Sequence, residues 1–330
     1  MVPQGSTRGA GALSVRPLVL AIVGPTASGK SSLAEEVATR LSTSIVSTDA
    51  MQVYCGMDIG TAKTPVGERK CPLLMVDICS VGEDYSVRLF QRDARAEVDA
   101  LLAQGKVPVL CGGTGLYLDA VVDQMDFPSG ERGSEVRERY ERLAESEGGD
   151  AVWRELERRD HESASLIHPH NVRRVIRALE LLDQGGSYAR THEGLHSRAS
   201  HYDSVIFGLK MDRQRLYRRI DERVDGMFDE GLVDEVRTLR EEGLELSTTA
   251  SQAIGYKEVL EFLGGRSTEN EARDLVKART RRYAKRQISW FKRDGRVRWL
   301  DMDALDTKGA ADVVLAGLSD TLEERRGLIG

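Results

Sequence analysis

The segment GPTASGKS, residues 24–31, has the residue types and the spacing that bind phosphate groups. It fits the pattern G-x-x-x-x-G-K-[ST], in which backbone N–H groups of the loop and of the following helix surround an anion. Lys30 adds a positive charge, and the Ser31 hydroxyl can ligate Mg²⁺. We therefore predict a site for a phosphate-bearing ligand formed by Gly24, Pro25, Thr26, Ala27, Ser28, Gly29, Lys30 and Ser31, with Mg²⁺ at Ser31.

Two acidic residues follow segments that are predicted to be buried strands. Asp49 ends SIVSTD and Asp77 ends LLMVD. Asp49 would face the phosphate-binding loop, where its carboxylate could hold Mg²⁺, accept a proton from a nucleophile, or cap the next helix. Asp77 has the form of a second Mg²⁺-holding carboxylate, with a turn or capping role as the alternative. Taken alone, these residues fit a small-molecule kinase.

A further strand end carries the segment CGGTGLY, residues 111–117. Its three glycines would allow the backbone to approach a ligand closely, and Thr114 supplies a hydroxyl group for hydrogen bonding. A tight turn between a strand and a helix explains the same glycines equally well.

These motifs lie where an alternating series of strands and helices would place them. Strands are predicted at residues 18–23, 44–49, 73–78, 107–113, 203–212 and 296–300, and the first is continuously apolar, as in a parallel sheet covered on both faces. Amphipathic helices are predicted after the phosphate-binding loop and over residues 87–102. We therefore predict an α/β fold with a doubly wound parallel sheet of the P-loop NTPase-like type, and ligands at the carboxyl ends of its strands.

The composition of the chain changes after residue 122. Residues 123–200 are highly charged, with helical periodicity interrupted by Gly and Pro, which predicts a helical insertion domain. The core would then comprise residues 17–122 and 201–330, and residues 1–16 would form a disordered leader. After the insertion, apolar positions from Leu216 to Leu239 predict one long helix.

Positive charge is concentrated near the C-terminus of a chain that is acidic overall. The formal net charge is −6, yet residues 277–298 hold ten Lys or Arg and one acidic residue, Asp294. Tyr283, Trp290 and Phe291 interleave aromatic rings, as on a nucleic-acid-binding surface. A run of charge is most often a solvated helix face, but such faces normally alternate in sign. The insertion adds a second basic group, made of Arg173, Arg174 and Arg177.

The remaining composition excludes several classes of protein. The four cysteines lack C-x-x-C pairing and a nearby His cluster, which argues against a disulfide framework and a structural zinc site and predicts reduced, mostly buried thiols. The apolar run at residues 18–23 is too short for a membrane span or a signal peptide. We expect a cytoplasmic protein that contacts no membrane, and a monomer, since no segment signals a dedicated interface.

Taken together and in order, the motifs resemble the tRNA dimethylallyltransferase family. The matching segments run from about residue 18 to 301 and are GPTASGKS, TDAMQVYCGMDIGTAK, GGTGLY, IHPHNVRRVIRALE, RVDGMFDEGLVDEV, AIGYKEV and TRRYAKRQISWFKRD. The resemblance implies transfer of a dimethylallyl group from dimethylallyl diphosphate to the exocyclic amine (N6) of the adenosine 3′-adjacent to the anticodon in tRNA. Diphosphate would be released, and Mg²⁺ would be the cofactor.

The resemblance also implies roles for individual residues. The phosphate-binding loop would hold the diphosphate, with Arg137 as a further contact. Asp49 would be the general base, and Thr114 and Arg223 would be further active-site residues. The insertion would contact tRNA, and the positions implied to do so along the chain are Asp49, Ala50, Met51, Gln52, Asn171, Val172, Arg173, Arg174, Val175, Gln252, Ala253, Ile254, Gly255, Tyr256, Lys257, Arg281, Arg282, Lys285 and Arg286.

One departure and two alternatives accompany this interpretation. Leu73 and Leu74 stand where the family usually has a His-His pair, so the role of those imidazoles cannot be assigned here. The sequence has no zinc-finger extension of the kind found in eukaryotic relatives, which favours a bacterial-type enzyme. A small-molecule kinase would explain the loop and the sheet but not the basic C-terminal segment. A nucleic-acid-binding ATPase would explain both, and it predicts RNA-stimulated ATP hydrolysis.

Overall fold

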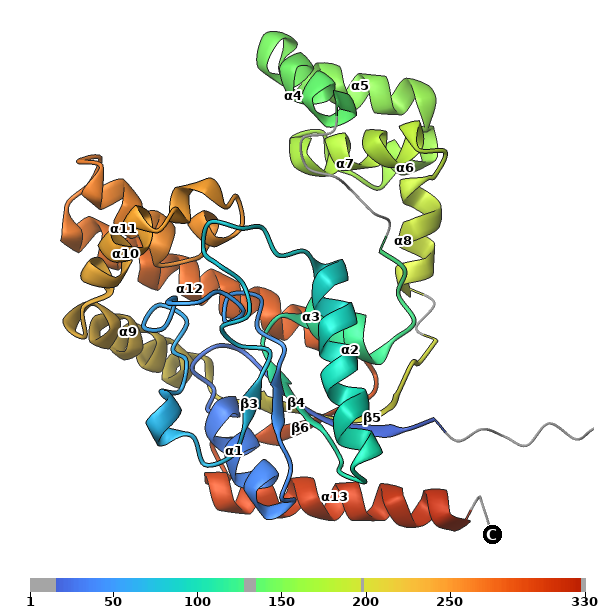
Figure 1. Cartoon of the computed structure of the whole chain (residues 1–330), viewed down its shortest axis with the longest axis vertical. Coiled ribbons are helices and arrows are strands. Elements are labelled where there is room, and N and C mark those ends of the chain that lie inside the picture. The colour runs from blue at the N-terminus through green and yellow to red at the C-terminus, as the bar shows by residue number, and fades with distance from the viewer. Residues whose placement is uncertain (1–15, 128–134, 197–198, 328–330) are drawn as a thin grey trace, which may run out of the picture.

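A six-stranded parallel sheet forms the centre of the molecule (Figure 1). The computed structural model describes residues 16–127, 135–196 and 199–327, so the predicted leader lies almost entirely outside the described residues. The strand order is β3-β2-β4-β1-β5-β6, and every pair of neighbours is parallel. The strands are β1 (Leu18–Val23), β2 (Ile45–Ser47), β3 (Leu73–Leu74), β4 (Val109–Gly112), β5 (Asp203–Lys210) and β6 (Val297–Asp301). The predicted doubly wound α/β sheet is confirmed.

The central strand β1 is apolar throughout because helices cover both faces of the sheet. Alternate residues of β1 enter different cores. Leu18, Leu20 and Ile22 pack with α1 (Lys30–Arg40) and α13 (Thr307–Gly327), which lie side by side on one face. Val19, Ala21 and Val23 pack with α2 (Val87–Ala103) and α3 (Gly115–Val122) and with the C-terminal helices on the other face. This alternation follows from the two-residue period of a strand.

The strand predicted at residues 73–78 is wrong in its length. β3 ends at Leu74, and the backbone then turns away from the sheet, with Met75 at φ 61° and Asp77 at φ 56°. Two non-glycine residues in the left-handed region are incompatible with a continuing strand. Asp77 therefore does not end a strand at the edge where the phosphate-binding loop lies.

The single long helix predicted from Leu216 to Leu239 is also wrong. The chain forms α9 (Arg213–Asp229) and α10 (Leu232–Glu241), separated at Gly231, which adopts φ 103°. A glycine in this left-handed conformation ends one helix and allows the next to begin in a new direction. Two short 3₁₀ turns at residues 244–246 and 250–252 then lead to α11 (Tyr256–Leu263) and α12 (Glu269–Phe291).

Helices α4 to α8, between β4 and β5 in the chain, form a separate lobe, drawn in green to yellow-green in Figure 1. They are α4 (Glu135–Glu147), α5 (Gly149–Arg159), α6 (His161–Ser165), α7 (Val172–Asp183) and α8 (Tyr188–His196). The lobe has its own apolar cluster, which includes Val152, Leu156 and Leu179. Where the lobe joins the core, the chain enters and leaves side by side: Asp123 and Ser200 form an antiparallel bridge, and the Gln124 N–H donates to the Ala199 carbonyl at 2.6 Å.

The structure also bears on the predicted state of the cysteines and on the question of membrane-spanning helices. All four cysteines are free thiols, of which Cys79 and Cys111 are buried and Cys71 is half-buried. Cys55 is exposed, so the prediction of mostly buried thiols is only partly right. In the described ranges, no helix is both long enough and apolar enough to cross a bilayer.

Candidate active site

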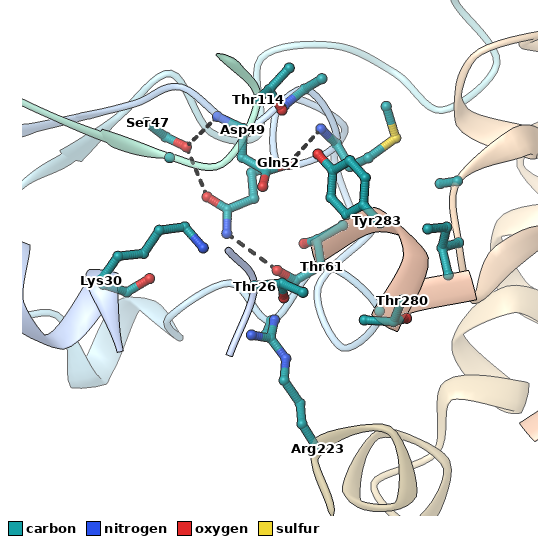
Figure 2. Close-up of a pocket in the computed structure, with 18 of the residues that line it drawn as sticks. Thr26, Lys30, Ser47, Asp49, Gln52, Thr61, Thr114, Arg223, Thr280 and Tyr283 are labelled. Atoms are coloured by element: carbon teal, nitrogen blue, oxygen red, sulfur yellow. Dashed lines mark hydrogen bonds between the residues drawn. The ribbon is translucent and has the colours of Figure 1, made fainter. Parts of the chain in front are cut away.

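A cavity of about 340 Å³ lies at the carboxyl ends of β1, β2 and β4 (Figure 2). The phosphate-binding loop, the segment after β2 and the GGTG loop form its walls on the sheet side. Helices α9 and α12 close it from the other side with Arg223, Met227, Thr280 and Tyr283. Ligand sites in open parallel sheets are expected at this edge.

The phosphate-binding loop has the conformation that its sequence predicts. Ala27 at φ 62° and Gly29 at φ 93° place the backbone in the left-handed region, and α1 begins directly at Lys30. No side chain caps the first turn of α1, and no acidic residue lies in that turn. The N–H groups at the start of α1 and the positive end of the helix dipole are therefore available to an anion.

Two cations line the cavity, Lys30 and Arg223, and neither pairs with a carboxylate of the described residues. Lys30 donates only a long hydrogen bond, 3.4 Å, to the Pro25 carbonyl, and Arg223 Nε is buried without a hydrogen-bond partner. Among the described residues, no carboxylate lies within ion-pair distance of either side chain. Burial lowers the pKa of Lys30, and burial likewise lowers the pKa of Arg223, although the charge of Asp49 opposes both shifts. Two unpaired, partly desolvated cations around one space favour an anionic ligand.

Because burial lowers the pKa of Lys30, we expect both anion binding and the stability of the protein to depend on pH. The ammonium group loses its proton at a lower pH than an ordinary lysine does, so affinity for inorganic diphosphate should fall as the pH rises through that lowered pKa. The unfolded chain keeps this proton to higher pH, so over the same window the free energy of unfolding of the ligand-free protein should rise. Titration calorimetry between neutral pH and the ordinary lysine range measures the first effect. Lys30→Arg is the control, because a guanidinium stays protonated and this part of the pH dependence should disappear.

Asp49 lies beside the cavity with one carboxylate oxygen unused. Its Oδ1 accepts the Met51 N–H at 2.9 Å, and its own N–H donates to Ser47 Oγ at 3.3 Å. Within the described chain Oδ2 has no hydrogen-bond partner, and Asp49 forms no ion pair. No helix begins after Asp49, so the carboxylate does not cap a helix: one oxygen stabilises a turn at residues 50–53, and the other is free to accept a proton.

Thr114 is linked to Asp49 through the backbone of the next residue. The Ala50 N–H donates to Thr114 Oγ1 at 3.1 Å. Tyr283 from α12 faces this pair across the cavity (Figure 2). Burial raises the pKa of Tyr283 to about 12, and the Asp49 charge adds to the rise, so the phenol stays protonated at neutral pH. The wall of the cavity therefore combines a free carboxylate oxygen with two hydroxyl groups.

Two glycines of the GGTG loop (residues 112–115) are required by the packing of α12, which the sequence did not predict. A Cβ on Gly113 would collide with the Gln287 amide group, and a Cβ on Gly115 would collide with the Trp290 ring. Trp290 Nε1 also donates to Asp119 of α3 at 3.1 Å. These glycines allow α12 to approach the loop, rather than only a ligand or a turn.

The predicted RNA-contact residues of the core fall into two groups. Nine line the cavity: Asp49, Ala50, Met51, Gln52, Gln252, Ala253, Ile254, Tyr256 and Arg286. The Gln52 carboxamide is already used internally, since Oε1 accepts the Ser47 hydroxyl at 2.9 Å and Nε2 donates to the Thr61 carbonyl at 3.3 Å. Gly255 (φ 99°) begins α11, and Lys257 donates to Gln252 at 2.9 Å.

Tyr256 lines the cavity, but its hydroxyl group is used within the protein. Its side chain is fully buried, its ring packs against Gly60, and its hydroxyl donates to Glu235 at 2.6 Å. The same carboxylate accepts the N–H groups of Asp58, Ile59 and Gly60. Glu235 thus fixes the loop that forms one side of the cavity.

In the insertion, the predicted segment 171–175 begins α7. Asn171 caps this helix by accepting the Arg174 N–H, and Arg173 and Arg174 are exposed. The Val175 side chain, in contrast, is fully buried in the core of the lobe, so it cannot contact RNA. A contact between RNA and the Val175 side chain is therefore excluded, because that side chain faces inward on α7. Val172 is half-buried against the same core.

Arg137 is not in the cavity. It lies on α4, where Nε donates to Glu141 at 2.8 Å and Nη1 is 3.6 Å from the buried Glu180. It lines a separate cleft of about 290 Å³ with Arg173, Thr248, Thr249 and Gln252. The structure therefore does not place Arg137 at the predicted diphosphate site, because its guanidinium group contacts Glu141 and Glu180 and lines this separate cleft.

Asp77 is likewise absent from the cavity. Its carboxylate pairs with the buried Lys63 ammonium at 2.5 Å, and the same ammonium donates to the Tyr54 carbonyl and to Asp58. The turn reading of Asp77 is therefore the correct one, and the suggestion of a second Mg²⁺-holding carboxylate is wrong.

The basic C-terminal segment is less positive at its surface than its composition suggests. Lys277 pairs with Asp225, Arg279 with the buried Glu258, and Arg281 with Asp221, while Arg296 binds Asp123 and Asp294. The interleaved aromatics are not a surface either, since Phe291 is buried and Tyr283 faces the cavity. An exposed stripe of three cations on α12 remains, made of Arg282, Lys285 and Arg286.

The residues missed in the sequence lie mainly on α12 and α9. Thr280, Tyr283 and Gln287 of α12 line the cavity at spacings of three and four, and Arg219 of α9 donates to the Ala27 carbonyl at 2.8 Å. The spacing of three and four residues places these α12 side chains on one face of a helix, and the sequence alone could have predicted that shared face. What the sequence could not show was which element this face would meet.

Together, the parallel sheet, the phosphate-binding loop after β1 and the free carboxylate across the cavity define an enzyme of the P-loop class. Comparison with known proteins identifies it further. The family model "IPP transferase" matches residues 52–294, and "Isopentenyl transferase" matches residues 17–69. The chain belongs to the IPP transferase family.

Curated relatives and solved structures agree with this assignment. The tRNA dimethylallyltransferase of Thermobifida fusca is 45% identical over 309 residues, covering 92% of this chain and 95% of its own. The tRNA isopentenylpyrophosphate transferase of Bacillus halodurans is 39% identical with a TM-score of 0.71, covering 95% and 99%. A structure of a eukaryotic dimethylallyltransferase acting on tRNA is 27% identical with a TM-score of 0.79, covering 93% and 80%.

Proposed function

We propose that this protein transfers a dimethylallyl group from dimethylallyl diphosphate to N6 of the adenosine 3′-adjacent to the anticodon in tRNA, and so acts as a tRNA prenyltransferase. The observation that carries the proposal is the shared cavity. Within the described part of the chain Lys30 and Arg223 have no carboxylate partner, and both face the same space as Asp49, whose Oδ2 has no described partner. Membership of the IPP transferase family supports the same reaction.

The two sides of the cavity suit the two halves of the reaction. As the bond between allylic carbon and oxygen breaks, negative charge collects on the departing diphosphate, and Lys30, Arg223 and the N–H groups at the start of α1 would stabilise it. The adenine amine is a weak nucleophile because its lone pair is delocalised into the ring. Asp49 would accept its proton as the new bond between carbon and nitrogen forms.

The donor set near Ser31 fits Mg²⁺ bound mainly through the substrate. Ser31 is exposed at the cavity, and among the described residues no group of three His, Cys, Asp or Glu could hold a metal ion. Mg²⁺ commonly keeps several waters and binds through one or two protein oxygens together with substrate phosphates. When bound, the ion would add positive charge next to the leaving group.

Exposed cations around the cavity, with Arg286 at its wall, would hold the RNA. Arg173 and Arg174 at the start of α7 and the stripe of Arg282, Lys285 and Arg286 are candidates for backbone contacts. The adenosine must leave the stack of the anticodon loop to enter the cavity, at a cost of about a few kcal/mol that such contacts can offset. We further propose that the enzyme works in the cytoplasm as a monomer.

Label transfer tests this function directly. The protein is incubated with an unmodified tRNA transcript and labelled dimethylallyl diphosphate, and ATP hydrolysis is followed in parallel. We expect label in the tRNA without ATP consumption, and loss of labelling when the adenosine 3′ to the anticodon is replaced by guanosine. ATP consumption without transfer would exclude the proposal and favour a kinase or an RNA-stimulated ATPase.

Removal of Mg²⁺ should slow the transfer. Chelation with EDTA is expected to lower the rate by roughly 10²-fold or more, because the ion contributes several kcal/mol to stabilisation of the leaving group. Ser31→Ala should raise the Mg²⁺ concentration needed for half-maximal rate, and Ser31→Thr, which keeps the hydroxyl, should restore it. An equal Mg²⁺ requirement in Ser31→Ala would remove Ser31 as a ligand.

A further inference from the structure

One side chain connects the two reactive walls of the cavity. Gln287 of α12 is buried, with 4% of its surface exposed. Its Oε1 accepts the Thr26 N–H at 2.9 Å, and its Nε2 donates to the Gly113 carbonyl at 3.0 Å. A single carboxamide therefore joins the phosphate-binding loop to the GGTG loop, through both of its polar atoms.

Each loop carries a different part of the chemistry. Thr26 belongs to the loop that receives the diphosphate. Gly113 precedes Thr114, whose hydroxyl accepts the Ala50 N–H next to Asp49. Gln287 packs tightly against the GGTG loop, because a Cβ on Gly113 would collide with the Gln287 amide nitrogen.

The contact also changes the role of Thr26. Its N–H points to Gln287 and is already hydrogen-bonded, so the anion must be held by other groups of the loop. A buried amide whose oxygen and nitrogen are both satisfied fixes the relative position of its partners more strictly than an apolar side chain of the same size does. An apolar residue would fill the space without orienting either loop.

We propose that Gln287 is a positioning residue that sets the spacing between the diphosphate site and the wall formed by Asp49 and Thr114. This inference rests on the proposed function. Transfer requires the allylic carbon and the adenine nitrogen to approach to about 3–3.5 Å, and a displacement of about 1 Å can cost roughly 10²-fold in rate. Loss of the bridge leaves each loop intact but frees one to move against the other.

Gln287→Met tests this role, since methionine has a similar size and neither hydrogen bond. We expect kcat to fall roughly 10-fold to 100-fold. The Kd for inorganic diphosphate should stay within about threefold, because the groups that bind the anion are unchanged. Gln91→Met is the matched control: the Gln91 carboxamide donates to the Ala120 and Met125 carbonyls, away from the cavity. This control should leave kcat unchanged.

Gln287→Asn provides a smaller change in case the methionine variant does not fold. The shorter side chain cannot bond both loops at once, so kcat should again fall while thermal stability stays close to that of the wild type. A folded Asn or Met variant that turns over at the wild-type rate would overturn the proposal. So would equal losses of kcat, diphosphate affinity and thermal stability, which indicate a packing role alone.

Hydrogen exchange of the wild-type protein gives a test that needs no variant. The Thr26 amide should exchange slowly in the free protein and gain no protection when inorganic diphosphate binds, whereas amides of residues 28–31 should gain protection. Fast exchange at Thr26 that slows on binding would show that the bridge is absent from the free enzyme. This measurement is independent of prenyl transfer, so failure of the proposed function and failure of the bridge are separate results.

Discussion

Asp49→Asn should lower kcat by on the order of 10²-fold or more while tRNA affinity stays close to that of the wild type. Asparagine can still accept the Met51 N–H through its side-chain oxygen, so the local turn is retained. The oxygen that is free to accept a proton is replaced by an amide NH₂, which cannot. Single-turnover rates of label transfer and filter binding of tRNA measure the two quantities separately.

The control for this prediction is Asp312→Asn. Asp312 lies on α13, pairs with Arg40 and is remote from the cavity lining, so its conversion should not change the rate. If Asp49→Asn transferred label at the wild-type rate, Asp49 would be excluded as the base. If it lost activity and tRNA affinity to the same extent, its role would be in binding.

Arg223→Gln should lower kcat/KM for the diphosphate substrate by roughly 10²-fold to 10³-fold, because a preorganised donor aimed at developing negative charge is worth about 3–4 kcal/mol. The same change should not lower the thermal stability of the ligand-free protein. In the described structure Arg223 Nε is buried without a partner and no carboxylate pairs with the guanidinium, so its charge is a cost to the fold until an anion binds.

Arg218→Gln, an exposed position on the same helix, serves as the control and should change neither quantity. Differential scanning calorimetry with and without inorganic diphosphate completes the test. The wild type should be stabilised by diphosphate, and Arg223→Gln much less. A large drop in the unfolding temperature of the ligand-free variant would show that Arg223 supports the fold instead.

Local patterns predicted β1, α2 and the phosphate-binding loop well because these depend on neighbouring residues. β1 and α2 appear within one residue of their predicted bounds, and Asp49 lies at the cavity as expected. The failures have local causes too. The predicted strand at residues 73–78 is too long because the left-handed backbone at Met75 has no simple sequence signature. The predicted long helix is wrong because Gly231 lies within an otherwise regular helical period of apolar residues.

The rest of the site depends on contacts that no local pattern encodes. Gln287 meets Thr26 across 261 positions of the chain, and the charge of α12 is partly cancelled by acids of α9 and α11. A count of Lys and Arg along one segment cannot include carboxylates that fold back onto it. Arg137 and Asp77 were misplaced for the same reason, since their partners Glu180 and Lys63 are fixed by the tertiary structure.

The join between the helical lobe and the sheet has a consequence for the evolution of the chain. Asp123 and Ser200 meet in one antiparallel bridge. The lobe therefore connects two adjacent points of the core, as the turn of a hairpin connects two strands. The entropy of closing such a connection grows only with the logarithm of its length, by about 0.6 kcal/mol for each doubling. Because the lobe also has its own apolar cluster, its helices can lengthen, shorten or exchange surface residues without disturbing the sheet. The lobe can therefore diversify in sequence while the sheet and its cavity stay fixed.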